Sequence, residues 1–375
     1  MDIEINWFQK GRKLGTVLPT GRKIYSYHNT CILVEATSIC TAKEIPLITV
    51  IIIAHNRRQF IKEAMKSAFD QQIPRERYEI IIVKNFHDEQ IDDYIQKNQC
   101  VGIYTKEPSL GGKCAVAIAK ARGEVISFLE DDDLFLETKI WRVSEVFKDE
   151  RVGYYHNECY VFRASNNILL FNNPRKLPNF KVKIDLRDLD VKKLRYLLKK
   201  KAYFNLSSIS IRKRVIVDYL YKLKEMNIAV DNFMFYIALS SGLCIVADSM
   251  VLTAYRRHSL NISVSSSREI SKFIEDSTFF LNSDILGYKI IRSLVNSVLL
   301  IQALDCRILA PRLNKYIIDR KSEHIRFSDY FDALKSSVQF RYKNLLLLVI
   351  MCLVTVPYAL AGKKLYYIFS SRNFS

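Results

Sequence analysis

One apolar segment limits the possible folds of this chain more than any other. Residues 47–54 read LITVIIIA, an unbroken and largely β-branched run. Such a run is typical of a strand that is buried on both faces of a parallel sheet. Residues 58–71 follow with apolar side chains at helical spacing, and residues 78–83 form a second apolar run. The order of strand, helix and strand predicts an α/β domain.

The same alternation continues along the chain. A short strand is expected at 102–104, a helix at 111–122 and another buried strand at 124–129. We therefore expect a mostly parallel sheet flanked by helices. Residues 259–340 are expected to be helical, with the apolar stretch 290–309 forming one packed helix. The predicted division is an N-terminal extension at 1–45, the α/β domain at 46–260, a helical region at 261–340 and a membrane-associating segment at 341–375.

Composition and charge narrow the class of protein. Hydrophobic residues make up 49% of the 375 residues, which excludes a collagen-like or wholly disordered chain. The net charge of +18 favours an anionic partner, namely a phosphate-bearing molecule, an acidic membrane surface or a nucleic acid. The eight cysteines form no C-x-x-C pair, which argues against a zinc knuckle and for a reduced, intracellular setting. The first ten residues have no apolar run typical of a secretory signal.

The C-terminal part contains a long uncharged segment. Residues 344–362 read NLLLLVIMCLVTVPYALAG and have basic residues on both sides. A helix of this length spans about 28 Å, close to the thickness of a bilayer core. Three readings stay open: a spanning helix, a helix lying in the membrane interface, and a buried terminal helix. Pro357 and the basic flanks weaken the first reading, so we expect membrane association rather than crossing.

Polar side chains follow the predicted buried strands. Asn56 and Arg57 come after the first strand, Asn85 after the second, and the acidic run Glu130-Asp131-Asp132-Asp133 after the last. In α/β sheets, ligands bind beyond the carboxyl ends of the strands. Adjacent carboxylates repel one another, and a divalent cation relieves that repulsion. The alternative is a solvated turn whose carboxylates stabilise the start of the next helix.

Several of these segments together resemble family 2 glycosyltransferases, which have the GT-A fold. The resemblance covers about 215 residues and keeps the order of the family's segments. The segments are 48–57 (ITVIIIAHNR), 78–83 (YEIIIV), 109–136 (SLGGKCAVAIAKARGEVISFLEDDDLFL), 230–242 (VDNFMFYIALSSG) and 255–263 (YRRHSLNIS).

The resemblance implies a metal and a nucleotide-sugar site. Asp131 and Asp133 would be the outer pair of the DXD motif that holds Mn²⁺ or Mg²⁺ on the donor diphosphate, with His258 near the metal. Asp132 would orient toward the ribose or the sugar. The other donor-binding residues implied are Asn56, Arg57, Asn85, Lys113 and Arg256.

The resemblance also implies a catalytic base. Asp231 matches the family's aspartate because Gly242 follows it at the expected spacing, and it would take the proton from the acceptor hydroxyl. The alternative is a helix N-cap, a position that Asp favours. Ser207 and Ser208 match a stretch where relatives carry acceptor-facing residues, although strand packing explains them equally well.

The chain departs from the family pattern in several places. Lys84-Asn85 replaces an acidic stretch that reads the nucleotide base, Ala54-His55 replaces Pro-Tyr, and Val230 replaces a glutamate. No Q-x-x-R-W stretch is present, which argues against a processive polysaccharide synthase.

The expected activity is inverting sugar transfer from a nucleotide-diphosphate donor to a glycan or lipid-linked acceptor. The expected location is the cytoplasmic face of the cell membrane. A catalytically degenerate relative that binds membranes or polyanions is the alternative. Binding to nucleic acid is not expected, because the basic residues follow no RNA-binding pattern. A nucleotidyltransferase would carry a glycine-rich phosphate loop after the first strand, where this chain has none.

Overall fold

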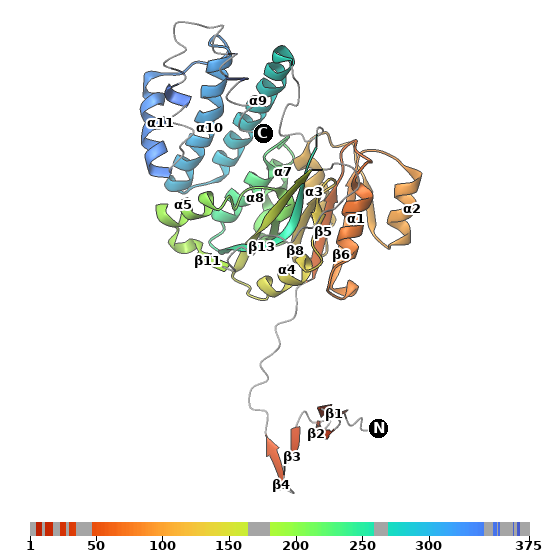
Figure 1. Cartoon of the computed structure of the whole chain (residues 1–375). Helices are drawn as coiled ribbons and strands as arrows, with labels where there is room; N and C mark the ends of the chain where they lie inside the picture. Colours follow the sequence, from red (N-terminus) through yellow and green to blue (C-terminus); the bar gives the residue numbers. More distant parts are fainter. Residues whose placement is uncertain are drawn as a thin grey trace. The chain divides into compact units, whose positions relative to one another are not determined.

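The computed structural model describes two compact units, residues 1–44 and 45–375. The described residues are the backbone of four strands before residue 35, residues 47–163, 181–258 and 269–340, and short pieces between 348 and 367. The first unit is an antiparallel sheet in which each strand pairs with the next (Figure 1). Its strands are β1 (Ile5–Gln9), β2 (Arg12–Val17), β3 (Lys23–Tyr27) and β4 (Thr30–Val34).

The second unit is built on a nine-stranded sheet, with the strands along its path in the order β11-β13-β10-β12-β8-β5-β6-β7 and β9 paired to β13 (Figure 1). The predicted strands at 47–54, 78–83, 102–104 and 124–129 are all present, each within two residues of the expected bounds. The strands are β5 (Ile48–Ile53), β6 (Tyr78–Lys84), β7 (Val101–Tyr104), β8 (Val125–Glu130), β9 (Leu134–Phe135), β10 (Val152–Arg163), β11 (Lys181–Asp185), β12 (Ile209–Arg212) and β13 (Cys244–Arg257).

The sheet is mixed, which corrects the expectation of a mostly parallel one. The strands β5, β6, β7 and β8 are parallel to their neighbours among themselves, as predicted. However, β12 lies between β8 and β10 and runs antiparallel to both, and β11 and β9 run antiparallel to β13. The strands of this half were hard to predict because buried polar residues such as His156 and Asn157 interrupt their apolar pattern.

Helices cover both faces of this sheet. Alternate residues of β5 enter two separate apolar clusters: Ile51 packs with α3 and α8, and Val50 packs with α1 and α4. The helices are α1 (Ile61–Phe69), α2 (Glu89–Lys97), α3 (Leu110–Lys120), α4 (Lys139–Phe147), α5 (Val191–Lys199), α6 (Lys213–Ile216), α7 (Leu220–Leu223), α8 (Val230–Leu239), α9 (Ile270–Leu294), α10 (Val298–Ile318) and α11 (Phe327–Phe340).

The predicted C-terminal helical region is present as α9, α10 and α11 (Figure 1). The single helix expected at 290–309 is wrong: α9 ends at Leu294 and α10 begins at Val298, because Val295 and Ser297 adopt extended backbone conformations. Side chains of α9 and α10 belong to the same apolar cluster as α3 and α8, so these helices share the core of the sheet domain.

Most of the predicted membrane segment 344–362 lies outside the described residues. Leu348, Val349 and Cys352 are described, and all three are buried in the cluster that includes α10. Among the helices that the structure describes, none combines the length and hydropathy needed to cross a bilayer.

Candidate active site

The carboxyl ends of β5, β6 and β8 bring the predicted polar residues together. The backbone N–H of Asn56 donates to Oδ1 of Asn85 at 2.9 Å, and Nδ2 of Asn85 donates to Oδ1 of Asn56 at 2.9 Å. Asn56 has a φ of 56°, a left-handed conformation that Asn tolerates better than most residues. This reciprocal pair ties the ends of β5 and β6, so the two asparagines form one edge of the site.

Lys84, the last residue of β6, is one of the positions where the chain departs from the family pattern, and its contacts are structural. Its side chain is buried and its ammonium group lies 2.6 Å from Asp92 of α2 and 2.7 Å from the carbonyl oxygen of Phe86. Lys84 therefore fastens α2 to the end of β6.

Arg57 bridges two carboxylates at the end of β8. Its Nη1 lies 2.6 Å from Oδ2 of Asp132, and its Nη2 donates to Oδ1 of Asp131. Burial raises the pKa of Asp131 to about 7, although the Arg57 charge opposes this shift. The guanidinium group thus supplies the positive charge that this acidic run requires.

His258, at the end of β13, approaches the same carboxylate. Its Nε2 lies 2.9 Å from Oδ2 of Asp132 and 3.5 Å from Nη1 of Arg57. Its ring packs 4.9 Å from the ring of Phe60, centroid to centroid. Although 126 residues separate Asp132 from His258 in the sequence, the fold places the two side chains as neighbours.

Asp133 has a different environment from its two neighbours. It is fully buried and accepts hydrogen bonds from Ser207 Oγ at 2.7 Å, Asn205 Nδ2 at 3.1 Å and the backbone N–H of Arg256 at 3.0 Å. Burial, followed by repulsion from Asp132, raises the pKa of Asp133 to about 7. Both carboxylate oxygens are therefore already used, and Asp133 joins β8, β13 and the turn before β12. Its predicted role as a metal ligand would require it to give up some of these bonds.

Arg256, a predicted phosphate ligand, is hydrogen-bonded to the backbone of the acidic run. Its Nε donates to the carbonyl oxygen of Asp132 at 2.8 Å, and its Nη2 lies 2.6 Å from a carboxylate oxygen of Glu63. The guanidinium carbon lies 4.4 Å from the centre of the Phe60 ring and 4.9 Å from that of Phe162. Arg256 is thus enclosed between two rings, and its binding role stays a prediction.

Lys113, the other predicted cation, lies in the first turn of α3 and is buried. Its Nζ donates to the carbonyl oxygen of Glu107 at 2.8 Å. Its charge and that of Arg57 lower the pKa of His55, which burial lowers most. A contact of Lys113 with phosphate stays a prediction.

Asp231 lies in the first turn of α8, where the residue before the helix is Ala229. Ala229 rather than Asp231 occupies the N-cap position, and its φ of 58° is unusual for a residue other than glycine. Oδ1 of Asp231 accepts bonds from the backbone N–H of Asn232 at 2.7 Å and from its Nδ2 at 3.0 Å. Burial raises the pKa of Asp231, and the bonds from Asn232 oppose this shift.

Glu130 links Asp231 to the strand-end carboxylates. Burial raises its pKa well above the usual range, and the charges of Asp132, Asp133 and Asp231 add to the shift in that order. Its backbone N–H donates to Oγ of Ser207 at 3.0 Å. The candidate base therefore shares one buried acidic environment with the end of β8.

Asn205 was missed by the sequence analysis, although the neighbouring Ser207 and Ser208 were considered. Its φ of 67° and its bond to Asp133 mark it as a residue held in place by the site. The short stretch NLSS before β12 was the available signal, but polar residues before a strand are common in turns.

Several buried polar atoms around this site have no hydrogen-bond partner among the described residues. Native structures pair nearly all such atoms, so a group of them in one place indicates a missing ligand or water. They include His55 Nδ1, Asp131 Oδ2, Asn205 Oδ1, Ser208 Oγ and Asn232 Oδ1.

The donor set at this site fits a divalent cation in part. In the described part of the chain, no cluster of three or more His, Cys, Asp and Glu side chains is arranged to hold a metal. Asp132 and His258 do direct an oxygen and a nitrogen toward one another. Mg²⁺ and related ions commonly take one or two protein ligands and complete their shell with waters and substrate phosphates. At 2.9 Å the two atoms are hydrogen-bonded to one another, so metal binding by this pair stays a prediction.

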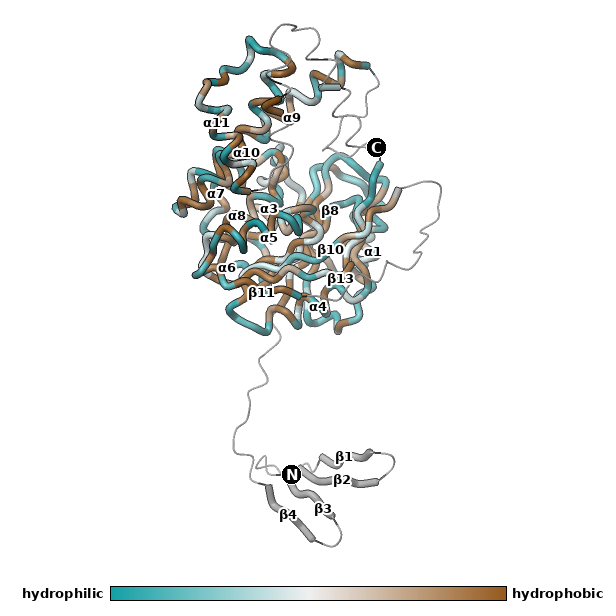
Figure 2. Tube along the Cα trace, turned by 60° about the vertical axis from the view of Figure 1, so that its left-hand side comes forward, coloured by the Kyte–Doolittle hydropathy of each residue, from teal (hydrophilic) through white to brown (hydrophobic). Residues whose placement is uncertain are grey.

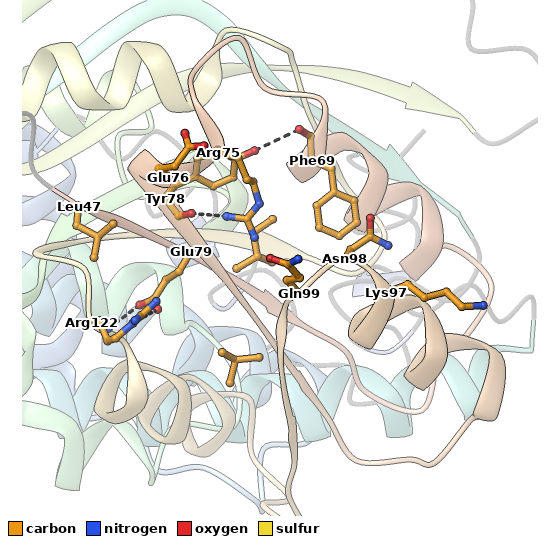
Figure 3. Close-up of a pocket in the computed structure, with 12 residues that line it drawn as sticks. Leu47, Phe69, Arg75, Glu76, Tyr78, Glu79, Lys97, Asn98, Gln99 and Arg122 are labelled. Carbon is orange, nitrogen blue, oxygen red and sulfur yellow. Dashed lines mark hydrogen bonds and ion pairs between the residues drawn. The ribbon is translucent and has the colours of Figure 1, made fainter.

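A pocket of about 530 Å³ lies at the amino ends of the strands, the end of the sheet opposite to the acidic run (Figure 3). Its lining includes Leu47, Tyr78 and Val101, which mark the amino ends of β5, β6 and β7, and the ion pair between Glu79 and Arg122. None of the predicted site residues lines this pocket.

Part of this chain is similar to known proteins. A model of the family described as glycosyl transferase family 2 matches residues 49–217. A probable glycosyltransferase, YdaM of Bacillus subtilis (strain 168), is 26% identical over 137 residues. That match covers 34% of this chain and 33% of the relative, so the chain matches about a third of the length of this relative.

Two solved structures are also similar to this chain. S. aureus TarS 1–349 has a TM-score of 0.48 and 16% identity, with 88% of this chain and 92% of that chain covered. Mannosyltransferase PcManGT from Pyrobaculum calidifontis, solved with GDP-Man and Mn²⁺, has a TM-score of 0.44 and 12% identity, with 84% and 87% covered. The matched family segment contains β5, β6 and β8 and the acidic run at the end of β8. Residues 49–217 of the chain thus match glycosyl transferase family 2.

Proposed function

We propose that this chain transfers a sugar from a nucleotide-diphosphate donor to an acceptor hydroxyl, with inversion at the anomeric carbon. The observation that carries the proposal is the acidic site at the end of β8. There Arg57, Asp132 and His258 meet, and the neighbouring Glu130 interacts electrostatically with both Asp132 and Asp231. The unpartnered polar atoms around these residues support a ligand site at this position.

Asp132 and His258 are proposed to hold Mn²⁺ or Mg²⁺, which requires them to give up the hydrogen bond between them and Asp132 to loosen its pair with Arg57. When bound, the ion would neutralise charge on the departing diphosphate. Asp133 is less suited, because its oxygens accept three hydrogen bonds. Arg57 already counters the charge of Asp131 and Asp132, and it would add positive charge where a diphosphate binds.

Asp231 is proposed as the general base. A base must accept a proton at the working pH, and burial raises the pKa of Asp231 in the direction that strengthens its basicity. Asn232 donates both of its bonds to Oδ1, and the backbone N–H of Asn205 also hydrogen-bonds to this carboxylate. We assign the acceptor hydroxyl to Oδ2, the oxygen to which Asn232 does not donate.

The acceptor is proposed to be a lipid-linked glycan or another cell-surface glycan precursor at the cytoplasmic face of the membrane. One face of α11 supports membrane contact. Phe327, Phe331, Leu334 and Val338 recur at helical spacing and are 76%, 60%, 38% and 76% exposed. Figure 2 shows hydrophobic and hydrophilic residues alternating along this helix. An exposed apolar stripe on a chain with a net charge of +18 fits an anionic bilayer surface.

The test is release of nucleoside diphosphate from a panel of nucleotide sugars, measured with Mn²⁺, with Mg²⁺ and with EDTA. We expect one donor to be turned over with metal and not with EDTA. Asp231→Asn should lower the transfer rate by about 10²–10⁴-fold, because the base is lost while the donor site is kept. Donor affinity, measured by calorimetry, should stay unchanged.

Asp93→Asn on α2 is the matched control, since it makes the same chemical change at an exposed position. It should leave both turnover and donor binding as they are. Loss of donor binding in Asp231→Asn would contradict the assignment of the base. If no donor is turned over, metal-dependent donor binding without release would favour a degenerate relative that only binds.

A further inference from the structure

The C-terminal helices pack directly against the segment that carries the candidate base. Gly287 of α9 lies so close to the loop before α8 that a Cβ placed on it would be 3.1 Å from Cε of Met226 and 3.8 Å from the carbonyl oxygen of Ile228. Asp284 precedes Gly287 by three residues, so both lie on the same face of α9. That face is therefore turned toward the start of α8, where Asp231 lies.

A second helix reaches the same place through aromatic contacts. The guanidinium carbon of Arg307, on α10, lies 4.4 Å from the centre of the Tyr203 ring. The Tyr203 ring lies 6.0 Å from that of Phe235, which follows Asp231 by one turn of α8. Residues four apart in a helix share a face, so Arg307 and Asp231 lie on the same side of α8.

The charges of these residues act on one another. The Arg307 charge lowers the pKa of Asp231, opposing the effect of burial. Burial and then the Asp231 charge raise the pKa of Asp284 to about 6, and Arg307 opposes this shift as well. The charge of Arg307 thus acts on two carboxylates, and Glu130 of β8 and Tyr154 of β10 interact electrostatically with Asp231 as well.

We infer that Asp284 and Arg307 are positioning residues for Asp231, so that the base is completed by helices outside the family-matched segment 49–217. This inference rests on the proposed function for its catalytic meaning. Arg307 keeps Asp231 charged in spite of its burial, and Asp284 limits that effect by competing for the same guanidinium group. The balance decides the pH above which Asp231 accepts a proton.

The first test does not depend on activity. Thermal unfolding is measured at pH 5.5 and pH 8 for Arg307→Met, for Asp231→Asn, for Asp284→Asn and for the double variants that contain Arg307→Met. Above its raised folded-state pKa of about 6, Asp284 is charged and needs Arg307. Arg307→Met should therefore lower the midpoint more at pH 8 than at pH 5.5.

When Asp231→Asn or Asp284→Asn is already present, Arg307→Met should lower the unfolding midpoint at pH 8 by less than it does in the wild-type protein. Residues that interact give non-additive losses in such cycles. Losses that are additive in both backgrounds would overturn the inference. If Arg307→Met does not fold, Arg307→Lys takes its place, and its pH-dependent loss should be intermediate because the positive charge is kept but the planar stacking on Tyr203 is not.

The matched control is the pair of Arg292 on α9 and Asp305 on α10, which is exposed on the same two helices. Arg292→Met and Asp305→Asn should produce losses of similar size at both pH values, since water screens this pair.

The second test is the pH profile of kcat/KM for release of nucleoside diphosphate. Arg307→Met should move the acidic limb to higher pH by about one unit, and Asp284→Asn should move it to lower pH. A merely structural role would lower the rate without moving the limb. If the wild-type protein turns over no donor, the proposed function fails, and the unfolding cycles alone decide whether Asp284 and Arg307 control the charge of Asp231.

Discussion

Neighbouring residues of one acidic run have different environments in this protein. Asp131 and Asp132 contact Arg57, whereas Asp133 accepts three hydrogen bonds from residues that hold the sheet together. The DXD resemblance made Asp131 and Asp133 the metal ligands and Asp132 the sugar contact. We propose Asp132, with His258, as the ion ligand instead, because the hydrogen-bond partners described for Asp132 belong to the site, whereas those of Asp133 hold the sheet together.

This difference predicts opposite outcomes for two substitutions. Asp133→Asn should lower the free energy of unfolding by about 1–3 kcal/mol. The new NH₂ group can only donate hydrogen bonds, and it would face a group that also donates, in a buried position. Asp132→Asn should change stability less and should lower the affinity for Mn²⁺ measured by calorimetry in the presence of the donor nucleotide. The measurements are denaturant unfolding and calorimetry on both variants. Equal loss of metal affinity in the two, with stability kept, would restore the original DXD assignment.

At the scale of elements, the position of α8 depends on how closely α3 approaches the loop before it. The backbone N–H of Gly111 donates to the carbonyl oxygen of Met226 at 2.9 Å. A Cβ on Gly111 would overlap the carbonyl oxygen of Leu223 and would lie 2.8 Å from that of Met226. Backbone atoms cannot move aside as a flexible side chain can, so this site requires glycine.

Gly111→Ala should therefore destabilise the protein by about 2–4 kcal/mol and lower activity, since the loop that leads to Asp231 must shift. Gly287→Ala is the control, because its Cβ would meet mainly the flexible end of Met226. That change should be neutral or should stabilise α9 by up to about 1 kcal/mol through helix propensity. The measurement is thermal unfolding of both variants. If the two are equally stable, the loop before α8 moves to accept the new methyl group and the prediction is wrong.

At the scale of the whole molecule, the +18 charge and the exposed stripe of α11 should act together at a membrane. We expect the protein to bind vesicles with anionic phospholipid more tightly than neutral ones, and less tightly as salt rises. Phe327→Ser with Phe331→Ser should weaken binding by roughly tenfold or more, since each ring is worth about 1.5–3 kcal/mol when buried. Vesicle cosedimentation measures both effects.

The control for the stripe is Phe279→Ser on α9, where the ring is also 60% exposed but lies outside the stripe. It should leave vesicle binding nearly unchanged. Equal binding by the α11 variant and the wild type would remove α11 as a contact surface, and the uncharged segment at 344–362 would then be the feature to test.

The local pattern of apolar and polar residues was enough to predict the strands β5 to β8 and the acidic run that follows β8. The strands β5, β6 and β8 are buried on both faces, so their sequences are mostly apolar and can be recognised alone. The second half of the sheet was not recognised, because His156, Asn157 and Asp248 are polar and acceptable in buried strands only through partners elsewhere in the chain.

The sequence by itself indicated the resemblance to family 2 glycosyltransferases, the polar residues after each strand and the candidate base, because each depends on residue types at short spacing. Only the tertiary structure decided which carboxylate is committed to the fold and which is near His258, since the partners of Asp132 and Asp133 are 72 or more residues away. It also brought Asp284 and Arg307 within electrostatic reach of Asp231. Burial and charge act through space, and the distances that govern them exist only once the chain has folded.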